Sequence, residues 1–205
     1  MALTERRVPL MKKLLVLFGS VYVAAVAVAV SAQQPQRDGP RYDGMRLVRP
    51  VDYREWPFLG SGLGLTYMEG NAATAAPPFT NVFVNPSSYR SFIATGAWPN
   101  QTVFVLESRR SETNAAPNVG GRFQGEMLGL EAEVKDTRFP EGWAFFNFGR
   151  AAALTSAAAP LAGDAVSACV ECHTQHTAVE RTFVQFYPTL LEVARRKGTL
   201  KPAFR

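Results

Sequence analysis

The sequence predicts an α+β fold, a mainly antiparallel β-sheet with flanking helices. Short segments with apolar residues at alternating positions follow one another through residues 58–148, and turn residues separate them. No βαβ unit follows the glycines at 60–64, so neither a parallel sheet nor a phosphate-binding loop is indicated there. After Gly149 the composition changes, and apolar residues recur at helical spacing toward the C-terminus.

Residues 1–32 have the three parts of a secretory signal peptide. Cations such as Arg6 and Lys12 precede an apolar run over 14–30, and small residues at Ala32 form a cleavage site. Because this run of 17 residues approaches the length of a membrane span, an uncleaved anchor is the alternative. We expect cleavage near Ala32, a soluble periplasmic protein, and membrane contact only through the signal peptide.

The mature chain of 173 residues fits one domain. Residues 33–48 are polar and contain two prolines, which predicts a flexible linker before a domain over 49–205. Without residues 1–32 the chain carries 18 Lys plus Arg against 16 Asp plus Glu, a net charge of +2 instead of +5. This charge, without a basic stripe among aromatic residues, excludes a nucleic-acid partner. The 14 phenylalanines favour a large apolar core and a dry pocket.

Up to five stretches of the domain are predicted as strands. They cover residues 58–67, 79–84, 102–107, 123–135 and 143–148. Glycines interrupt the first stretch, and Gly125 or Gly129 is expected to form a bulge in the fourth. A polar loop is expected over 109–121.

A helix is predicted over residues 86–95. Asn85 is a favoured N-cap residue, Pro86 suits the first helical position, and Gly96 ends the pattern.

A second helical pattern lies near the C-terminus. Apolar residues between Val179 and Leu190 recur at helical spacing, and we expect Pro188 to kink or interrupt the helix. Gly198 is expected to stop it after a last turn rich in cations.

The chemically informative sequence is Cys169-Val170-Glu171-Cys172-His173, which reads C-x-x-C-H, the attachment motif for c-type haem. Two thiols three residues apart lie on one face of a helical turn, where they can add to the two vinyl groups of one porphyrin. His173 then supplies an axial imidazole to the iron. The sequence therefore predicts one covalently attached haem c per chain on a C-terminal helix.

Other interpretations of these residues are weaker. A thioredoxin-like pair needs a βαβ context, which the sequence around residue 169 lacks. A zinc site would have to draw its four ligands from the eight residues 169–176, whereas zinc modules usually join two separated pairs. An inert buried cysteine pair is the remaining alternative. The small all-helical cytochromes c are excluded because no methionine follows His173, and the four-helix cytochromes c′ because strands precede the motif.

The second axial position of the iron is expected to be open. His176 lies on the same side of the porphyrin as His173 and cannot reach the opposite face, but it can pair with Glu180. The mature chain contains three methionines, Met45, Met68 and Met127. Methionines are more often core residues than ligands. An open position favours a small diatomic ligand or a redox substrate, whereas a closed one favours electron transfer.

The chain resembles the cytochrome P-460 family, which includes the cytochromes c′-beta. The resemblance runs from Arg49 to about Pro188 and includes the C-x-x-C-H motif. The other segments that match the family are residues 53–56 (YREW), 81–86 (NVFVNP), 129–131 (GLE), 134–136 (VKD), 142–146 (GWAFF) and 182–188 (TFVQFYP). The resemblance implies a mainly antiparallel β domain with helices, a C-terminal haem, a five-coordinate iron and usually a homodimer.

One position divides this family. Its hydroxylamine-oxidising members join a strand lysine to the porphyrin, and Leu106 stands here where that lysine would be. No lysine occurs between Lys13 and Lys135, so a shift in register does not restore one. The departure points to the c′-beta branch, whose members have an apolar, Phe-lined distal face and bind NO or CO.

Candidate pocket residues follow from strand geometry. Phe104 and Leu106 point to the same side of their strand, and we expect them to face the haem, with Phe123 from a neighbouring strand. Asp164 and Glu107 are candidates for proton transfer.

Three functional hypotheses remain open. The first is a periplasmic cytochrome that binds NO or a similar small ligand. The second is a haem oxidoreductase that acts on hydroxylamine or another small nitrogen compound. The third is a simple electron carrier. The expected partners are a small gaseous ligand or nitrogen compound and a redox partner protein.

Overall fold

The computed structural model describes residues 38–65 and 76–205, and Asp38–Arg205 form one compact unit. The predicted signal peptide and residues 33–37 of the predicted linker lie outside the described residues. Within the described part of the chain, no helix has the length and apolar character needed to cross a membrane.

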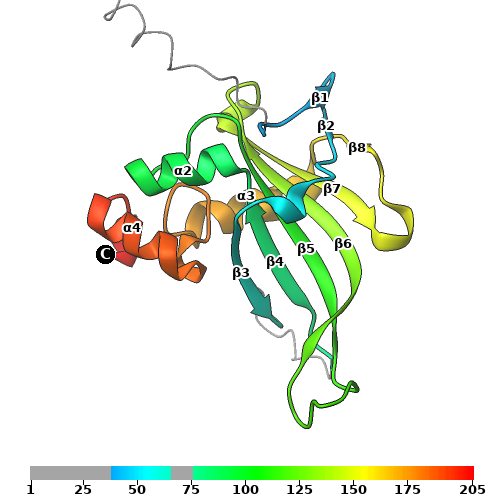
Figure 1. Ribbon diagram of the computed structural model, residues 1–205. Helices are drawn as coiled ribbons and strands as arrows, with labels where there is room; N and C mark the ends of the chain where they lie inside the picture. The colour runs from blue at the N-terminus through cyan, green and yellow to red at the C-terminus, as the bar shows by residue number, and fades with distance from the viewer. Residues whose placement is uncertain (1–37, 66–75) are drawn as a thin grey trace, which may run out of the picture. The chain divides into compact units, whose positions relative to one another are not determined.

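Five antiparallel strands form the main sheet, and each pairs with the next in sequence (Figure 1). They are β3 (Phe58–Leu63), β4 (Phe79–Val84), β5 (Thr102–Glu112), β6 (Phe123–Lys135) and β7 (Trp143–Arg150). A smaller antiparallel sheet has the order β1 (Tyr42–Asp43), β2 (Arg46–Val48), β8 (Ala157–Ala158). The predicted antiparallel α+β class is confirmed, and the order agrees with the tendency of consecutive strands to pair.

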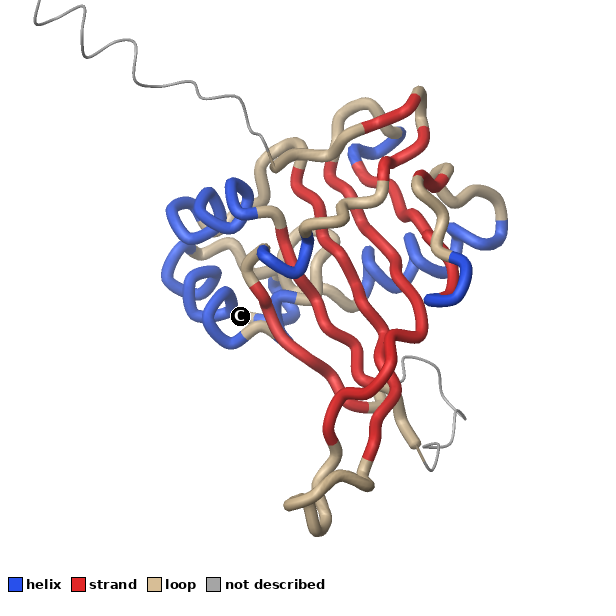
Figure 2. The backbone as a smooth tube through the Cα atoms, turned by 45° about the vertical axis from the view of Figure 1, so that its right-hand side comes forward, coloured by secondary structure: helices blue, strands red, loops and turns tan. Residues whose placement is uncertain are grey.

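In the described residues three α-helices accompany the sheet, and Figure 2 shows them in blue against the red strands. They are α2 (Pro86–Thr95), α3 (Asp164–Gln175) and α4 (Pro188–Lys197). Single 3₁₀ turns occur at η1 (Tyr53–Glu55), η2 (Pro140–Gly142), η3 (Ala151–Ala153), η4 (Val184–Phe186) and η5 (Pro202–Phe204). In Figure 1 α3 passes behind the main sheet, whereas η1 lies in front of it.

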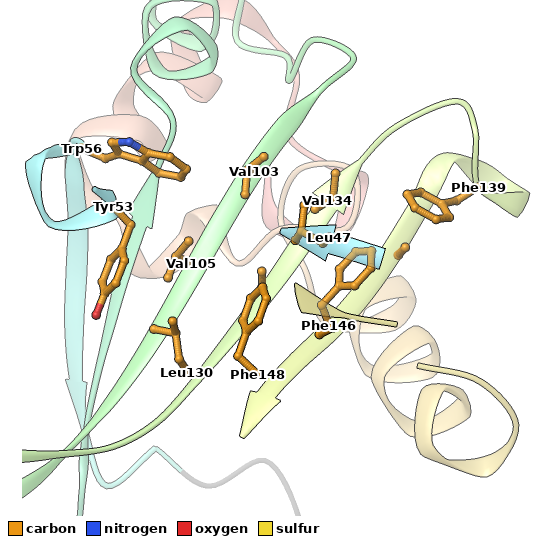
Figure 3. Close-up of a cluster of buried hydrophobic side chains, with 13 residues drawn as sticks. Leu47, Tyr53, Trp56, Val103, Val105, Leu130, Val134, Phe139, Phe146 and Phe148 are labelled. Carbon is orange, nitrogen blue, oxygen red and sulfur yellow. The ribbon is translucent and has the colours of Figure 1, made fainter. Parts of the chain in front are cut away.

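The two faces of the main sheet have separate cores because side chains alternate along each strand. On β5, Val103 and Val105 belong to the cluster drawn in Figure 3, which also contains Tyr53 and Trp56 from around η1. Phe104, between the two valines, belongs to the second cluster, with residues of α2 and α4. The cavity described below lies on this second face.

The predicted linker over 33–48 is wrong from residue 38 onward. Leu47 in β2 is completely buried in the first cluster and pairs with Ala158 in β8. The Asp38 carboxylate accepts hydrogen bonds of 2.7 Å from the backbone nitrogen and the hydroxyl of Ser87, in the first turn of α2. A polar, proline-containing composition indicated a linker, but these long-range contacts fix the segment to the domain.

Asn85 occupies the predicted N-cap position of α2, but its side chain does not cap the helix. Its amide oxygen accepts a hydrogen bond of 2.8 Å from the Val103 backbone nitrogen on β5. Asn85 therefore joins the helix entry to the sheet, and Asp38 supplies the carboxylate at the helix N-terminus.

The loop predicted over 109–121 is shorter in the structure because β5 continues to Glu112. Ser108 pairs with Gly129 but Arg109 pairs with Met127, so one residue of β6 is left over at this point. A further irregularity follows beside Gly125. The expected bulges are thus present, and they let the two strands extend past the rest of the sheet (Figure 1).

The C-terminal segment is divided as Pro188 suggested. The helical pattern predicted from Val179 is wrong over its first half, where Val179 and Thr182 form an isolated β-bridge. Pro188 is the first residue of α4, where its missing N–H has no cost, and Gly198 ends the helix in the left-handed conformation at φ 69°.

Candidate functional site

A cavity of about 430 Å³ lies between the second face of the main sheet and α3. Its size falls within the range of small-molecule and cofactor sites. The strands contribute Gly60, Ser61, Gly62, Thr80, Val82, Phe104, Leu106, Glu131, Ala132, Glu133, Phe145 and Phe146. Helical and loop segments contribute Leu65, Leu161, Cys169, His173, Thr182, Phe183, Phe186 and Tyr187.

The C-x-x-C-H motif lies in the middle of α3, as predicted. Cys169 and His173 are one turn apart and both line the cavity. Cys172 lies three residues after Cys169 on the same helix and is half-buried. None of the 12 residues of α3 is buried by the rest of the described chain. The helix therefore borders the cavity instead of packing into a core of the sheet.

The imidazole ring of His173 is fixed by a hydrogen bond and two aromatic contacts. The Nδ1 atom lies 2.8 Å from the carbonyl oxygen of Arg181. A carbonyl only accepts hydrogen bonds, so Nδ1 carries the proton and Nε2 keeps its lone pair. The rings of Phe145 and Phe183 stand edge-on to the imidazole, each with 4.8 Å between centroids. This arrangement selects the tautomer that an Nε2 metal ligand needs.

A carboxylate lies beside the same nitrogen. The Oε1 atom of Glu133 is 3.2 Å from His173 Nδ1, within ion-pair distance. Burial raises the pKa of Glu133, and the neighbouring imidazole opposes that shift. Burial lowers the pKa of His173, but the adjacent carboxylate of Glu133 and the hydrogen bond to the Arg181 carbonyl outweigh it, so the pKa of His173 is raised overall.

The loop that carries the Arg181 carbonyl is fixed by an ion pair. Glu180 has a left-handed backbone at φ 51°, which is unfavourable for a side chain of its size. Its carboxylate accepts hydrogen bonds from Lys135 Nζ and from the Trp98 backbone nitrogen. Thr177 also donates to the Glu180 carbonyl at 3.0 Å. The sequence suggested His176 as the partner of Glu180, but Lys135 occupies that place.

The three residues predicted to face the haem lie in two different places. Phe104 and Leu106 line the cavity. Phe123 does not, because it is the first residue of β6, pairs with Glu112 and is 37% exposed. Nothing in a single strand's alternation reveals how far along the sheet a residue lies, so strand parity did not separate Phe123 from Phe104 and Leu106.

Neither proton-transfer candidate lines the cavity. Asp164 is exposed in the first turn of α3. Glu107 is buried on the opposite face of the sheet, where the Tyr53 hydroxyl donates to it at 2.7 Å and Arg54 at 3.1 Å.

Among the described residues, no methionine lines the cavity, and His173 is its only histidine. Met45 is 50% exposed, and the sulfur of Met127 lies 3.9 Å from the Tyr53 hydroxyl. Met68 lies outside the described residues. No cluster of three or more His, Cys, Asp or Glu side chains suited to a metal ion occurs in the described ranges, so the zinc alternative gains no support.

The sequence prediction missed two pocket carboxylates, Glu131 and Glu133. They alternate on β6 with Leu130, Ala132 and Val134, which belong to the first core. Their register places Glu131 opposite Leu106 and Glu133 opposite Phe104. Alternation along β6 could have placed both on one face, but only tertiary pairing brings that face to the cavity.

The comparison with known proteins agrees with this geometry. A family model described as Cytochrome P460 matches residues 50–184. The chain belongs to the cytochrome P460 family. The matched range includes every residue that lines the cavity except Phe186 and Tyr187. A search of curated proteins found no match to this chain. Membership in the cytochrome P460 family supports a haem c-type cytochrome.

The residues at the cavity suit a haem. A cytochrome P460 chain needs an axial nitrogen, and His173 offers Nε2 with its other nitrogen already hydrogen-bonded. Aromatic and aliphatic side chains form most of the wall, as a porphyrin face requires. The Oε1 atom of Glu133 is buried without a hydrogen-bond donor, so the wall also holds a polar atom that the described protein does not satisfy.

Proposed function

We propose that this cytochrome P460 chain is a monohaem c-type cytochrome with one open axial position that binds NO or a similar small neutral ligand. Cys169 and Cys172 attach the haem through thioether bonds, and His173 Nε2 is the proximal iron ligand. The observation that carries the proposal is the hydrogen bond from His173 Nδ1 to the Arg181 carbonyl, within the cavity that Cys169 also lines.

The two cysteines are placed for attachment to one group. Both thiols are free and lie one helical turn apart, with Cys169 on the cavity wall. Burial, with the nearby charges of Glu131 and Glu133, raises the pKa of Cys169. A thiol of raised pKa stays protonated at neutral pH, which disfavours binding a metal ion as thiolate.

The far wall of the cavity favours a neutral ligand. Val82, Phe104 and Leu106 are apolar and lie on neighbouring strands, and Val82 pairs directly with Leu106. A neutral diatomic loses little hydration when it enters such a space, whereas an ion loses much. When bound, the haem supplies an iron that accepts the ligand at its open position. Leu106 cannot form the porphyrin cross-link that the family resemblance associates with hydroxylamine oxidation.

One observation favours a second function, the oxidation of hydroxylamine or another small nitrogen compound. Glu131 lines the cavity beside Leu106, its pairing partner on β5, and burial raises the pKa of Glu131. A carboxylate with a raised pKa can accept a proton from a bound substrate near neutral pH. Asn147 donates a hydrogen bond of 3.0 Å to this carboxylate and orients it.

Absorption spectra of the purified holoprotein, with and without CO, separate these functions. A haem c spectrum whose reduced form changes on addition of CO supports the ligand-binding cytochrome. A strongly red-shifted Soret band would indicate a cross-linked porphyrin and favour the oxidase. A reduced protein whose spectrum does not change on addition of CO would indicate an iron with protein ligands at both axial positions, and so an electron carrier.

A variant tests the ligand assignment separately. His173→Ala should retain haem through the two thioethers but lose the proximal nitrogen, so its iron spectra should change. Unchanged spectra would contradict the role of His173.

Location and assembly complete the proposal. We propose that residues 1–32 export the chain to the periplasm, where it acts as a homodimer with a redox partner protein. The mass of the purified mature chain tests the cleavage near Ala32, and light scattering tests the dimer.

A further inference from the structure

Glu133 is a buried acid without a hydrogen-bond donor at its inner oxygen. Its side chain is only 11% exposed, and Oε1 lacks a hydrogen-bond partner among the described residues. Such an oxygen normally destabilises a fold, because it has lost water without gaining a donor. A cost of this kind in the wall of a binding cavity points to a role in binding or chemistry.

The position of this oxygen indicates what it acts on. It lies 3.2 Å from His173 Nδ1, whose single proton is directed to the Arg181 carbonyl at 2.8 Å. The carbonyl therefore fixes the orientation of the ring, and the carboxylate adds charge at the same nitrogen. Register keeps Glu133 in place, because β6 pairs it with Phe104 on one side and Phe145 on the other.

The nearby cations do not neutralise Glu133 directly. The Arg181 guanidinium forms an ion pair with Glu141, and Lys135 forms one with Glu180. Each of these cations therefore has a carboxylate of its own. The group that lies closest to the Oε1 atom of Glu133 is the imidazole Nδ1 of His173, whose Nε2 is free to bind a cation.

We infer that Glu133 is a positioning residue for the axial ligand of the haem. Its carboxylate increases the electron donation of His173 to the iron and stabilises the ferric state over the ferrous state. This inference rests on the proposed function, since it requires His173 to bind the iron. A carboxylate behind a ligating histidine is known to raise the basicity of the ligand, and here the residue that supplies it is Glu133.

The test compares Glu133→Gln with Glu131→Gln in the holoprotein. Both variants remove one carboxylate from the same strand and the same cavity, but only Glu133 contacts His173. Two quantities are measured, the midpoint potential of the haem and the iron–histidine stretching frequency of the reduced protein by resonance Raman spectroscopy.

We expect Glu133→Gln to raise the ferrous-to-ferric ratio at a fixed potential about tenfold, which is 59 mV for a one-electron couple. The same variant should lower the iron–histidine frequency. Glu131→Gln should leave that frequency unchanged and shift the potential less, because the carboxylate in contact with His173 is that of Glu133. Equal potentials in the two variants with an unmoved frequency would overturn the inference.

Two further variants keep the result interpretable. Glu133→Met replaces the carboxylate with an apolar side chain of similar length, and it should raise the potential as Glu133→Gln does even if the glutamine variant folds poorly. If His173→Ala leaves the iron spectra unchanged, the proposed function itself is wrong. If His173→Ala changes them while both Glu133 variants match the wild type, only the role of Glu133 is wrong.

Discussion

The Tyr53 hydroxyl donates a hydrogen bond of 2.7 Å to the buried carboxylate of Glu107, on the face of the sheet away from the cavity. Arg54 and Arg109 also donate to this carboxylate. Burial raises the pKa of Glu107, but the three hydrogen bonds outweigh it and the pKa is lowered from its ordinary value of 4.5. Glu107 therefore has a structural role on this face, away from the cavity that a proton-transfer group would have to reach.

We predict that Glu107→Gln lowers the free energy of unfolding at pH 7 by about 2 kcal/mol, because two partly exposed arginines lose their anion. A group with a lowered folded-state pKa stabilises the protein above its unfolded pKa, and this contribution is lost as the pH falls through the folded pKa. The difference between wild type and variant should therefore shrink below about pH 4.5. Urea denaturation at pH 7 and pH 3.5 measures it.

Tyr53→Phe is the matched control for Glu107. It removes one hydrogen bond, at a cost of about 1 kcal/mol, but leaves both arginines on the carboxylate. The acid-dependent loss of stability should therefore persist in Tyr53→Phe. A pH-independent stability difference in Glu107→Gln would contradict an ionised Glu107.

Leu47→Ala tests whether the segment before residue 49 belongs to the domain. Leu47 is fully buried, and truncation of a buried leucine costs about 3 kcal/mol through lost burial and the cavity left behind. Met45→Ala, two residues earlier and 50% exposed, should change the stability by less than about 0.5 kcal/mol. Chemical denaturation of the two variants should separate these values, and equal stabilities would restore the linker interpretation.

The strands of the main sheet were predictable because their alternation is local. Residues 79–84 and 123–135 were assigned with the bounds that β4 and β6 have in the structure. The β1 and β2 strands were not, since their stability comes from β8, more than 100 residues later. A two-residue strand carries no periodicity that sequence analysis could detect.

The candidate site likewise contains residues that local sequence predicts and contacts that only the fold creates. Cys169, Cys172 and His173 follow from a motif, and Phe104 and Leu106 from strand parity. The contact between Glu133 and His173 joins residues 40 positions apart and depends on the fold. Phe123 lies outside the cavity, beyond the irregular register beside Gly125 and Gly129 in β6.

Lys135→Met tests the ion pair that fixes the loop before Arg181. Lys135 and Glu180 are each 26% exposed, and Lys135 also donates to the Trp98 carbonyl at 2.6 Å. Charge-assisted hydrogen bonds in a partly buried place are worth more than exposed pairs, so we predict a loss of about 2 kcal/mol. The exposed pair of Arg195 and Glu192 is the control, and Glu192→Gln should cost less than about 0.5 kcal/mol.

The Lys135 variant should also affect the axial ligand. Release of Glu180 loosens the backbone that presents the Arg181 carbonyl, so the orientation of the His173 ring should become less uniform. Electron paramagnetic resonance of the ferric holoprotein should show broader lines for Lys135→Met than for Glu192→Gln. Equal line widths would mean that the carbonyl is held without the ion pair.

Leu106→Ala tests the assignment of the ligand-binding wall. Leu106 is half-buried and lines the cavity next to its β6 partner Glu131. Truncation of Leu106 therefore enlarges the space available to a ligand. The ratio of the affinities of the reduced holoprotein for n-butyl isocyanide and for CO should rise about tenfold. This is the effect expected when an apolar pocket gains space for one or more methylene groups. Phe123→Ala removes a larger side chain outside the cavity and should leave this preference unchanged. Ligand titrations followed by absorption give both ratios, and a response of Phe123→Ala equal to that of Leu106→Ala would show that the wall has been misassigned.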